Sequence, residues 1–394
     1  MTDQSMTFAD VLAPVGVDSF IRDYFEKKPL ILHREDRTYF DRLLTLDDID
    51  RHLNFVGHKF PDIAVANALE EIPTSEYVVG GDRIDKNRVY QLFDQGATIV
   101  MRKMHTFVPA LARLVRSAEK QFSCEFQCNV YFTPPGAKQG FKIHYDTHDI
   151  FALQVIGAKT WRIYGTPVEM PLVGQDYDRS VMQPGERTQE FDLKSGDMYY
   201  FPRGLVHDCV TPDEPSVHIT LGMLSHTWTE LFVEALMGVC QEDAEFRRYL
   251  PIGAMGPDAD PATMEASFRA LVERFAEKVK LAPALERFRD GFITSRQPDT
   301  LGRSADYQRL GQLTASSSVG PRADLIYRLQ DNGDTVSLHV NTAEIKLPAA
   351  AASALKFTLE SPRFSIGDVP GLADDSSKLT LVRRLVREGL LTIH

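Results

Sequence analysis

The chain has 394 residues, of which 43% are hydrophobic and 25% are charged, close to the proportions of ordinary globular proteins. Its 44 basic and 55 acidic side chains give a net charge of −11 with histidine neutral, which disfavours bare nucleic acid as a partner and favours a basic one. No apolar run approaches the roughly 20 residues of a membrane span, and a chain this long is expected to form two or three domains.

The N-terminal residues lack a basic start followed by an apolar stretch, so we expect no secretion and a cytoplasmic protein. Four cysteines are too few for a disulfide framework at this length, which fits a reducing compartment. Cys124 and Cys128 form a C-x3-C pair without a second pair, which argues against a zinc site. The two remaining cysteines are Cys209 and Cys240.

In chain order, residues 8–55 mix short helical patterns with an apolar strand at 29–33. From about 60 to 225, short β-rich runs separated by Gly, Pro and Asp predict an antiparallel barrel. We therefore expect residues 1–225 to form an N-terminal segment and a barrel domain.

The periodicity changes after residue 225. Residues 226–305 are rich in helix formers with apolar spacing near 3.6, and proline and glycine divide them into separate helices. In residues 306–394 we expect strands around an Asp-Asn-Gly-Asp turn, a helix at 349–359, an amphipathic helix at 376–389 and a last strand. The overall fold class is thus α+β.

The most informative motif is His144-Tyr145-Asp146, followed 63 residues later by His207. In an extended strand, side chains two positions apart point to the same side, so His144 and Asp146 would face inward together. Two imidazoles and one carboxylate can occupy one face of an octahedral Fe(II) and leave three positions open for a co-substrate and O2. The motif therefore predicts an oxygenase.

The sequence before His207 supports this interpretation. Gly196-Asp197 indicates a turn, residues 198–201 indicate a strand, and Pro202-Arg203-Gly204 indicates a second turn. A histidine directly after such a turn can reach back into a barrel.

Four stretches together resemble one known family: residues 129–136, His144 to Asp146, residues 151–164 and residues 196–208. They resemble the JmjC-type ribosomal oxygenases, which include a bacterial ribosomal protein arginine hydroxylase and eukaryotic ribosomal histidine hydroxylases. The motif-rich match covers roughly residues 125 to 225, and residues 20–32 also look like the family's N-terminal signature.

The resemblance implies a double-stranded β-helix (cupin/JmjC) barrel, a helical dimerisation region and a C-terminal winged helix. It implies that His144, Asp146 and His207 bind Fe(II). Lys159, 15 positions after His144, would bind the distal carboxylate of 2-oxoglutarate through a charge-assisted hydrogen bond. The pocket beside the iron and co-substrate would be lined by Asn129, Tyr131 and Thr220.

Two further histidines are ambiguous. Strand periodicity permits His148 to face inward, but the resemblance assigns the ligands to His144 and Asp146. His218 lies on a plausible strand, either beside the site or as an inert barrel residue.

The leading hypothesis is a 2-oxoglutarate and Fe(II) dependent hydroxylase of an Arg or His side chain in a ribosomal protein, acting as a homodimer. The alternatives are a JmjC lysine demethylase, a cupin that works without 2-oxoglutarate, and a non-catalytic binding module. A winged helix can bind DNA, but acidic residues dilute its basic ones, so direct DNA binding is not expected.

Overall fold

The computed structural model describes residues 5–57, 59–136, 138–257, 260–296 and 299–394. The chain divides into two compact units, Met1–Ser225 and His226–His394. Whether the second unit contains two domains, with a boundary near residue 305, stays a prediction. No helix in the described ranges has the length and apolar character needed to cross a membrane.

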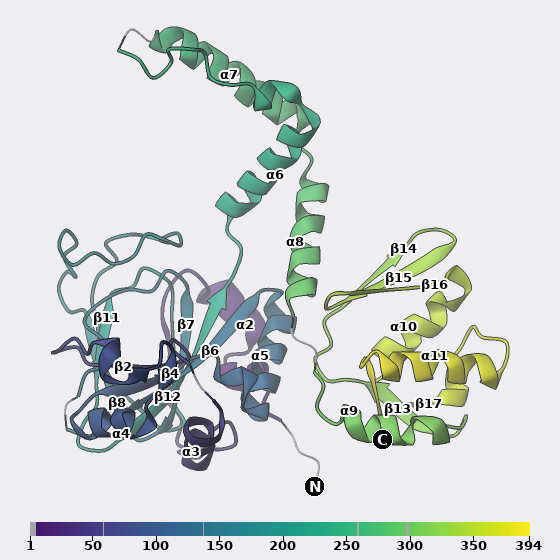
Figure 1. Ribbon diagram of the computed structural model, residues 1–394, viewed down its shortest axis with the longest axis horizontal. Coiled ribbons are helices and arrows are strands. Elements are labelled where there is room, and N and C mark those ends of the chain that lie inside the picture. The colour runs from purple at the N-terminus through teal and green to yellow at the C-terminus, as the bar shows by residue number, and fades with distance from the viewer. Residues whose placement is uncertain (1–4, 58, 137, 258–259, 297–298) are drawn as a thin grey trace. The chain divides into compact units, whose positions relative to one another are not determined.

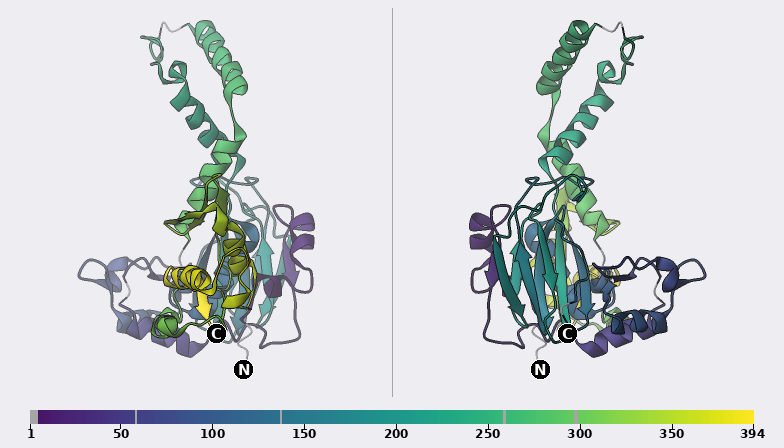
Figure 2. Two further views of the ribbon diagram at one scale, coloured as in Figure 1. Left: turned by 90° about the vertical axis from the view of Figure 1, so that its right-hand side faces the viewer. Right: turned by 90° about the vertical axis from the view of Figure 1, so that its left-hand side faces the viewer.

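Two antiparallel sheets form the centre of the first unit (Figure 1). Figure 2 shows the strands of the larger sheet side by side. In spatial order the larger sheet consists of β1 (Leu30–Leu32), β10 (Met198–Phe201), β7 (Asp149–Ile156), β12 (Ser216–Leu224), β6 (Glu125–Thr133), β5 (Thr98–Met101) and β2 (Ile63–Ala66). The smaller sheet consists of β11 (His207–Val210), β8 (Ala158–Ile163) and β9 (Gln189–Lys194), and a separate hairpin joins β3 (Val78–Val79) to β4 (Arg83–Ile84).

The helices of the first unit correct one expectation, because the stretch from residue 60 is not only β-rich. Its longest helix, α5, buries Leu111, Leu114, Val115 and Ala118, which lie on one face because they are three or four positions apart. This helical spacing is present in the sequence, although the stretch as a whole was predicted to be β-rich. The helices of this unit are α1 (Phe8–Leu12), α2 (Val17–Asp23), α3 (Leu46–Phe55), α4 (Lys86–Asp94) and α5 (Pro109–Phe122).

The two faces of the larger sheet have different surroundings. Along β12, Val217, Ile219 and Leu221 belong to the main apolar core, together with buried residues of α1, α3 and α5. The alternate residues of β12 point to the opposite face, since successive side chains of a strand alternate. On that face a second apolar cluster joins both sheets, with members such as Ala152 of β7 and Trp161 of β8. The space between the sheets is therefore partly apolar and partly polar.

The second unit begins with the expected helices, α6 (Trp228–Glu242), α7 (Pro261–Lys278) and α8 (Leu281–Ser295). Figure 1 shows α6 running beside α8, and an ion pair between Arg287 and Glu234 joins these two helices. Thr227 caps α6 by accepting a hydrogen bond from the backbone N–H of Glu230, which explains why the helix begins there.

The described residues of the rest of the second unit form two three-stranded sheets and three α-helices. The expected helices and last strand are present, but the sequence interpretation missed two short strands that bring β18 into a sheet. The elements are α9 (Arg303–Arg309), β13 (Ser318–Pro321), β14 (Arg328–Asp331), β15 (Thr335–Val340), β16 (Ala343–Pro348), α10 (Ala352–Glu360), β17 (Phe364–Ser365), α11 (Asp375–Arg387) and β18 (Leu391–Ile393). A winged helix stays a prediction for this region.

Candidate metal centre and co-substrate pocket

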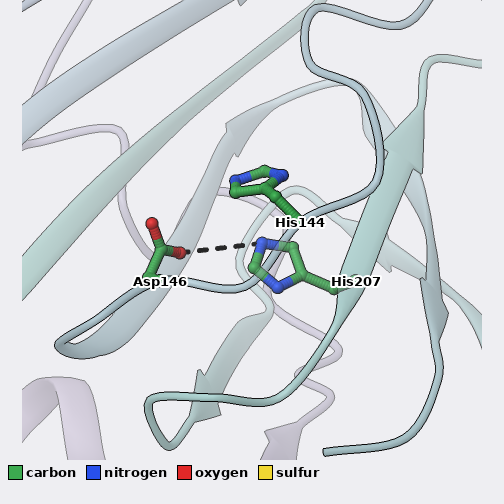
Figure 3. A group of neighbouring side chains, drawn as sticks. All are labelled: His144, Asp146 and His207. Atoms are coloured by element: carbon green, nitrogen blue, oxygen red, sulfur yellow. Dashed lines mark ion pairs between the residues drawn. The ribbon is translucent and has the colours of Figure 1, made fainter. Parts of the chain in front are cut away.

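Three side chains from two distant segments of the chain meet beside the smaller sheet. His144, Asp146 and His207 each offer one ligand atom, and these atoms lie within 4.8 Å of one another (Figure 3). Nε2 of His207 is 3.7 Å from Oδ2 of Asp146, and the two imidazole centroids are 4.7 Å apart. The structure thus brings together the three residues that the sequence motif singled out.

The backbone that carries two of them differs from the expected strand. His144 forms an isolated antiparallel bridge with His207, with N···O distances of 3.1 and 2.8 Å, and β7 begins only at Asp149. The carbonyl of Asp146 accepts a hydrogen bond from the N–H of Gly204 at 3.0 Å. The bridge to His207 and the hydrogen bond from Gly204 therefore position His144 and Asp146, although neither residue belongs to a continuous strand.

Both histidines are oriented by backbone carbonyls two residues before them. Nδ1 of His144 lies 2.8 Å from the carbonyl oxygen of Lys142, and Nδ1 of His207 lies 3.0 Å from that of Leu205. Because a carbonyl only accepts, each Nδ1 carries the hydrogen and each Nε2 keeps its lone pair. This is the tautomer that a metal ligand requires, and the carbonyls fix the ring orientation.

Burial of His207 keeps it in the same neutral state. Its side chain is almost fully buried, and this burial, together with the neighbouring His144, lowers the pKa of His207 to about 4, although Asp146 opposes the shift. A neutral imidazole at neutral pH can donate its lone pair to a metal without first losing a proton.

The loop between β8 and β9 holds the segment that carries His144. The hydroxyl of Tyr145 donates a hydrogen bond to the carbonyl of Gln175 at 2.7 Å, and Nε of Arg179 donates to the carbonyl of Ile143 at 2.9 Å. Tyr145 is buried and turned toward this loop, while its two neighbours lie in the cluster. The alternation expected of an extended segment is thus kept without a strand.

The donor set fits a divalent iron ion better than a soft metal. It consists of two imidazole nitrogens and one carboxylate oxygen, without a thiolate. Such a set on one side of an ion leaves further coordination positions open, as in non-haem Fe(II) oxygenases.

Lys159 lies in the space between the sheets and is 3% exposed. On β8 it shares a face with Trp161 and Ile163, which belong to the apolar cluster there. Burial lowers the pKa of Lys159, and a hydrogen bond with the thiol of Cys209 opposes the shift. Within the described ranges, no carboxylate pairs with its ammonium group. Since a buried charge without a counter-charge is costly, this position favours an anionic ligand.

The other predicted pocket residues lie on two neighbouring strands. Thr220 of β12 is opposite Asn129 of β6, whose Oδ1 accepts a hydrogen bond from the N–H of Lys103 at 3.2 Å. Burial, with a further contribution from Asp146, raises the pKa of Tyr131 to about 12, so its hydroxyl stays protonated and can donate. These side chains are suitably placed for the pocket, and their ligand contacts stay a prediction.

The two ambiguous histidines lie in different places. His148 is outside the metal cluster and packs against Gly222, where an added Cβ would approach its Nε2 to 2.7 Å. His218 is 3% exposed and stacks on the Tyr131 ring, with centroids 4.8 Å apart and an angle of 7° between planes.

Sequence reasoning missed the role of Cys209 as the neighbour of Lys159. The signal was available, because Cys209 follows His207 by two positions on β11 and so shares its face. Which residue it meets across the sheets was not available from the sequence.

Comparisons with known proteins agree with this geometry. A family model described as the JmjC domain matches residues 101–231, a range that contains all three metal-cluster residues. The bifunctional lysine-specific demethylase and histidyl-hydroxylase NO66 of Aedes aegypti is 30% identical over 434 residues, covering 98% of this chain and 67% of that protein. The chain belongs to the JmjC-domain ribosomal oxygenase family. It is therefore a 2-oxoglutarate-dependent oxygenase, as predicted.

The similarity to other relatives covers nearly the whole length of the oxygenase. Ribosomal oxygenase 2 of Bos taurus is 27% identical over 427 residues, covering 98% of this chain and 91% of the relative. A solved structure of Escherichia coli YcfD has the same fold, with a TM-score of 0.55, 16% identity and coverage of 96% and 98% of the two chains. The likeness extends well beyond the motif-rich segment, so the mixed α+β JmjC/cupin fold is confirmed.

Proposed function

We propose that the oxygenase uses Fe(II), 2-oxoglutarate and O2 to hydroxylate an Arg or His side chain of a ribosomal protein. The observation that carries this proposal is the buried ammonium of Lys159, which has no carboxylate partner in the described ranges. Lys159 lies on the same face of β8 as Trp161, whose ring centroid is 5.6 Å from that of His207 in the metal cluster. A metal site combined with a cation pocket matches a ligand that has a chelating 2-oxo acid at one end and a second carboxylate at the other. Consistent with this, a solved structure of Escherichia coli YcfD is a complex with cobalt and 2-oxoglutarate.

In this mechanism His144, Asp146 and His207 would hold the iron. When bound, the iron would supply the chemistry by which O2 oxidises 2-oxoglutarate to succinate and CO2 and hydroxylates a substrate carbon, with one oxygen atom entering each product. The protein orients the reactants and excludes water from them. Lys159 anchors the distal carboxylate, and the Tyr131 hydroxyl is a further donor near it.

A ribosomal protein is the proposed substrate because several relatives are named ribosomal oxygenases and because the net charge of this chain favours a basic partner. The oxygenase carries a net charge of −11, which attracts basic proteins such as those of the ribosome and accelerates their encounter with it. We also propose that the enzyme acts in the cytoplasm.

Mass spectrometry of ribosomal proteins, from cells with and without this gene, tests the substrate. We expect one Arg or His residue to carry an additional oxygen, about 16 Da, only when the gene is present. Cells that express the Asp146→Ala variant are the matched control and should lack the modification. Ribosomal proteins with identical masses in all three cell lines would contradict the proposal.

A lysine demethylase is the second candidate, favoured by one observation. The relative from Aedes aegypti is named for both demethylase and histidyl-hydroxylase activities. Demethylation removes a methyl group from lysine, whereas hydroxylation adds oxygen, so the two reactions change peptide mass in opposite directions. The same measurement therefore distinguishes them.

We also propose that the oxygenase is a homodimer through residues 226–305. Helix α6 exposes Trp228, Phe232 and Leu236, which are 75%, 61% and 40% exposed. They follow one another at four-residue spacing and so lie along one face of the helix. An exposed apolar stripe of this kind is typical of a surface that a second chain covers.

The dimer proposal predicts a change in mass when this stripe is made polar. Light scattering after size-exclusion chromatography should give two 44.4 kDa chains for the native protein and one for the Phe232→Glu variant. Leu69→Glu, at an apolar side chain of the first unit that is 88% exposed, is the control and should stay dimeric. A native protein with the mass of one chain would refute the dimer.

A further inference from the structure

Four side chains from the two sheets, Lys159 among them, interact with one another. Lys159 of β8 hydrogen-bonds to Cys209 of β11, and Cys209 is close enough to Tyr131 of β6 to act on it electrostatically. Tyr131 stacks on His218 of β12, and Lys159 in turn acts on His218. These four side chains, which the stacking contact and the electrostatic interactions link to one another, we call the Lys159 pocket. The predicted pocket residues include two of its members but omit His218.

His218 has an unsatisfied polar atom inside this pocket. Its side chain is 3% exposed, and Nδ1 has no hydrogen-bond partner within the described part of the chain. A buried polar group left without a partner is destabilising. Oε1 of Gln154, the residue opposite His218 on β7, is also buried and unpartnered. Two unpaired polar atoms on paired residues of neighbouring strands, one of them in a ring that the buried Lys159 influences, indicate a site for a polar ligand.

The His218 ring is held in place by aromatic contacts. It lies parallel to the Tyr131 ring at a centroid distance of 4.8 Å and nearly perpendicular to Trp161 at 6.1 Å. Two aromatic neighbours from different strands restrict the rotation of the imidazole, so its nitrogen atoms keep a defined direction. A fixed donor is preorganised to bind a ligand with little loss of conformational entropy.

The His218 side chain is neutral, so it can bind an anion that also contacts Lys159. Burial, together with the nearby Lys159, lowers the pKa of His218 well below its usual value, so the ring stays neutral. A neutral imidazole carries one N–H donor and does not repel the ammonium. Lys159, His218 and the Tyr131 hydroxyl would then offer three kinds of donor to the two oxygens of a carboxylate.

We propose that His218 binds the co-substrate directly, donating a hydrogen bond from Nδ1 to the distal carboxylate of 2-oxoglutarate beside Lys159. This inference rests on the proposed function, because it takes 2-oxoglutarate as the ligand of the pocket. It assigns two tasks to one ring: the nitrogen binds the co-substrate, and the aromatic face holds Tyr131.

Two variants separate these tasks. His218→Phe keeps an aromatic ring beside Tyr131 but removes the nitrogen, whereas His218→Asn loses the ring and places an amide near the position of Nδ1. Calorimetric titration of the Mn(II)-loaded protein compares 2-oxoglutarate with 2-oxopentanoate, which has the same chain length but no distal carboxylate. Mn(II) allows binding to be measured without turnover.

We expect His218→Phe to weaken 2-oxoglutarate binding about tenfold and to leave 2-oxopentanoate binding unchanged, since a hydrogen bond to a charged group is lost only with the first ligand. His218→Asn should bind 2-oxoglutarate more tightly than His218→Phe. Equal affinity of His218→Phe and the native protein for 2-oxoglutarate would overturn the assignment, as would an equal loss for both ligands. If the native protein itself did not bind 2-oxoglutarate, the proposed function would fail as well, which distinguishes the two failures.

Discussion

Replacing either His144 or Asp146 by alanine is expected to abolish succinate formation from 2-oxoglutarate, with a loss of at least about 100-fold. Each substitution removes one of three proposed ligands whose donor atoms lie within 4.8 Å of one another, and even outer-sphere changes around metal sites typically cost roughly 10–100-fold. The measurement is succinate release detected by NMR, together with the iron content of the purified protein after dialysis.

His148→Ala is the matched control for these variants. His148 lies two residues after Asp146 but outside the metal cluster, so its removal should leave the iron content unchanged. Native turnover in both His144→Ala and Asp146→Ala would show that the metal assignment is wrong.

Replacing Lys159 by methionine is expected to raise the KM for 2-oxoglutarate by about 100-fold. A charge-assisted hydrogen bond between a buried ammonium and a carboxylate contributes about 1.5 to 3 kcal/mol, and each 1.4 kcal/mol corresponds to a factor of about ten. The free protein should not be destabilised in proportion, because within the described ranges Lys159 has no carboxylate partner and methionine removes a buried charge.

Thermal unfolding with and without 2-oxoglutarate separates these two effects of Lys159→Met. The co-substrate should raise the melting temperature of the Mn(II)-loaded native protein and have little effect on the variant, since a ligand stabilises only the state that binds it. Lys159→Arg, which keeps the positive charge, should retain part of the response. An unchanged KM in Lys159→Met would show that another group binds the distal carboxylate.

Much of the site could be predicted because the motif is short and its chemistry is restrictive. His144 and Asp146 are two positions apart, and an extended backbone places such side chains on the same side whether or not it forms a full strand. The turn, strand and turn before His207 were also readable, and they correspond to β10 and the residues that lead into β11. The family and its oxygenase activity, predicted from these residues, are confirmed.

Other parts of the fold could not be predicted in the same way. The sequence of α5 has helical spacing, but it lies among β-rich segments, and the whole stretch was predicted to be β-rich. The short strands β13 and β17 carry little periodicity of their own, because a two- to four-residue strand is defined by its partners. The local sequence pattern is least informative for a strand that forms only by pairing with a distant segment.

By itself, the sequence determined the class of chemistry, because only a few residue types can bind iron and leave positions open, and His144, Asp146 and His207 were recognisable as such a set. The resemblance of its motifs to a known family also indicated Lys159. Only the tertiary structure decided that Lys159 is buried beside Cys209 and that His218 stacks on Tyr131 with a nitrogen that no described residue pairs with. Those facts depend on how four strands from two sheets face one another. The distances between side chains across sheets are set by long-range packing, which local periodicity does not encode.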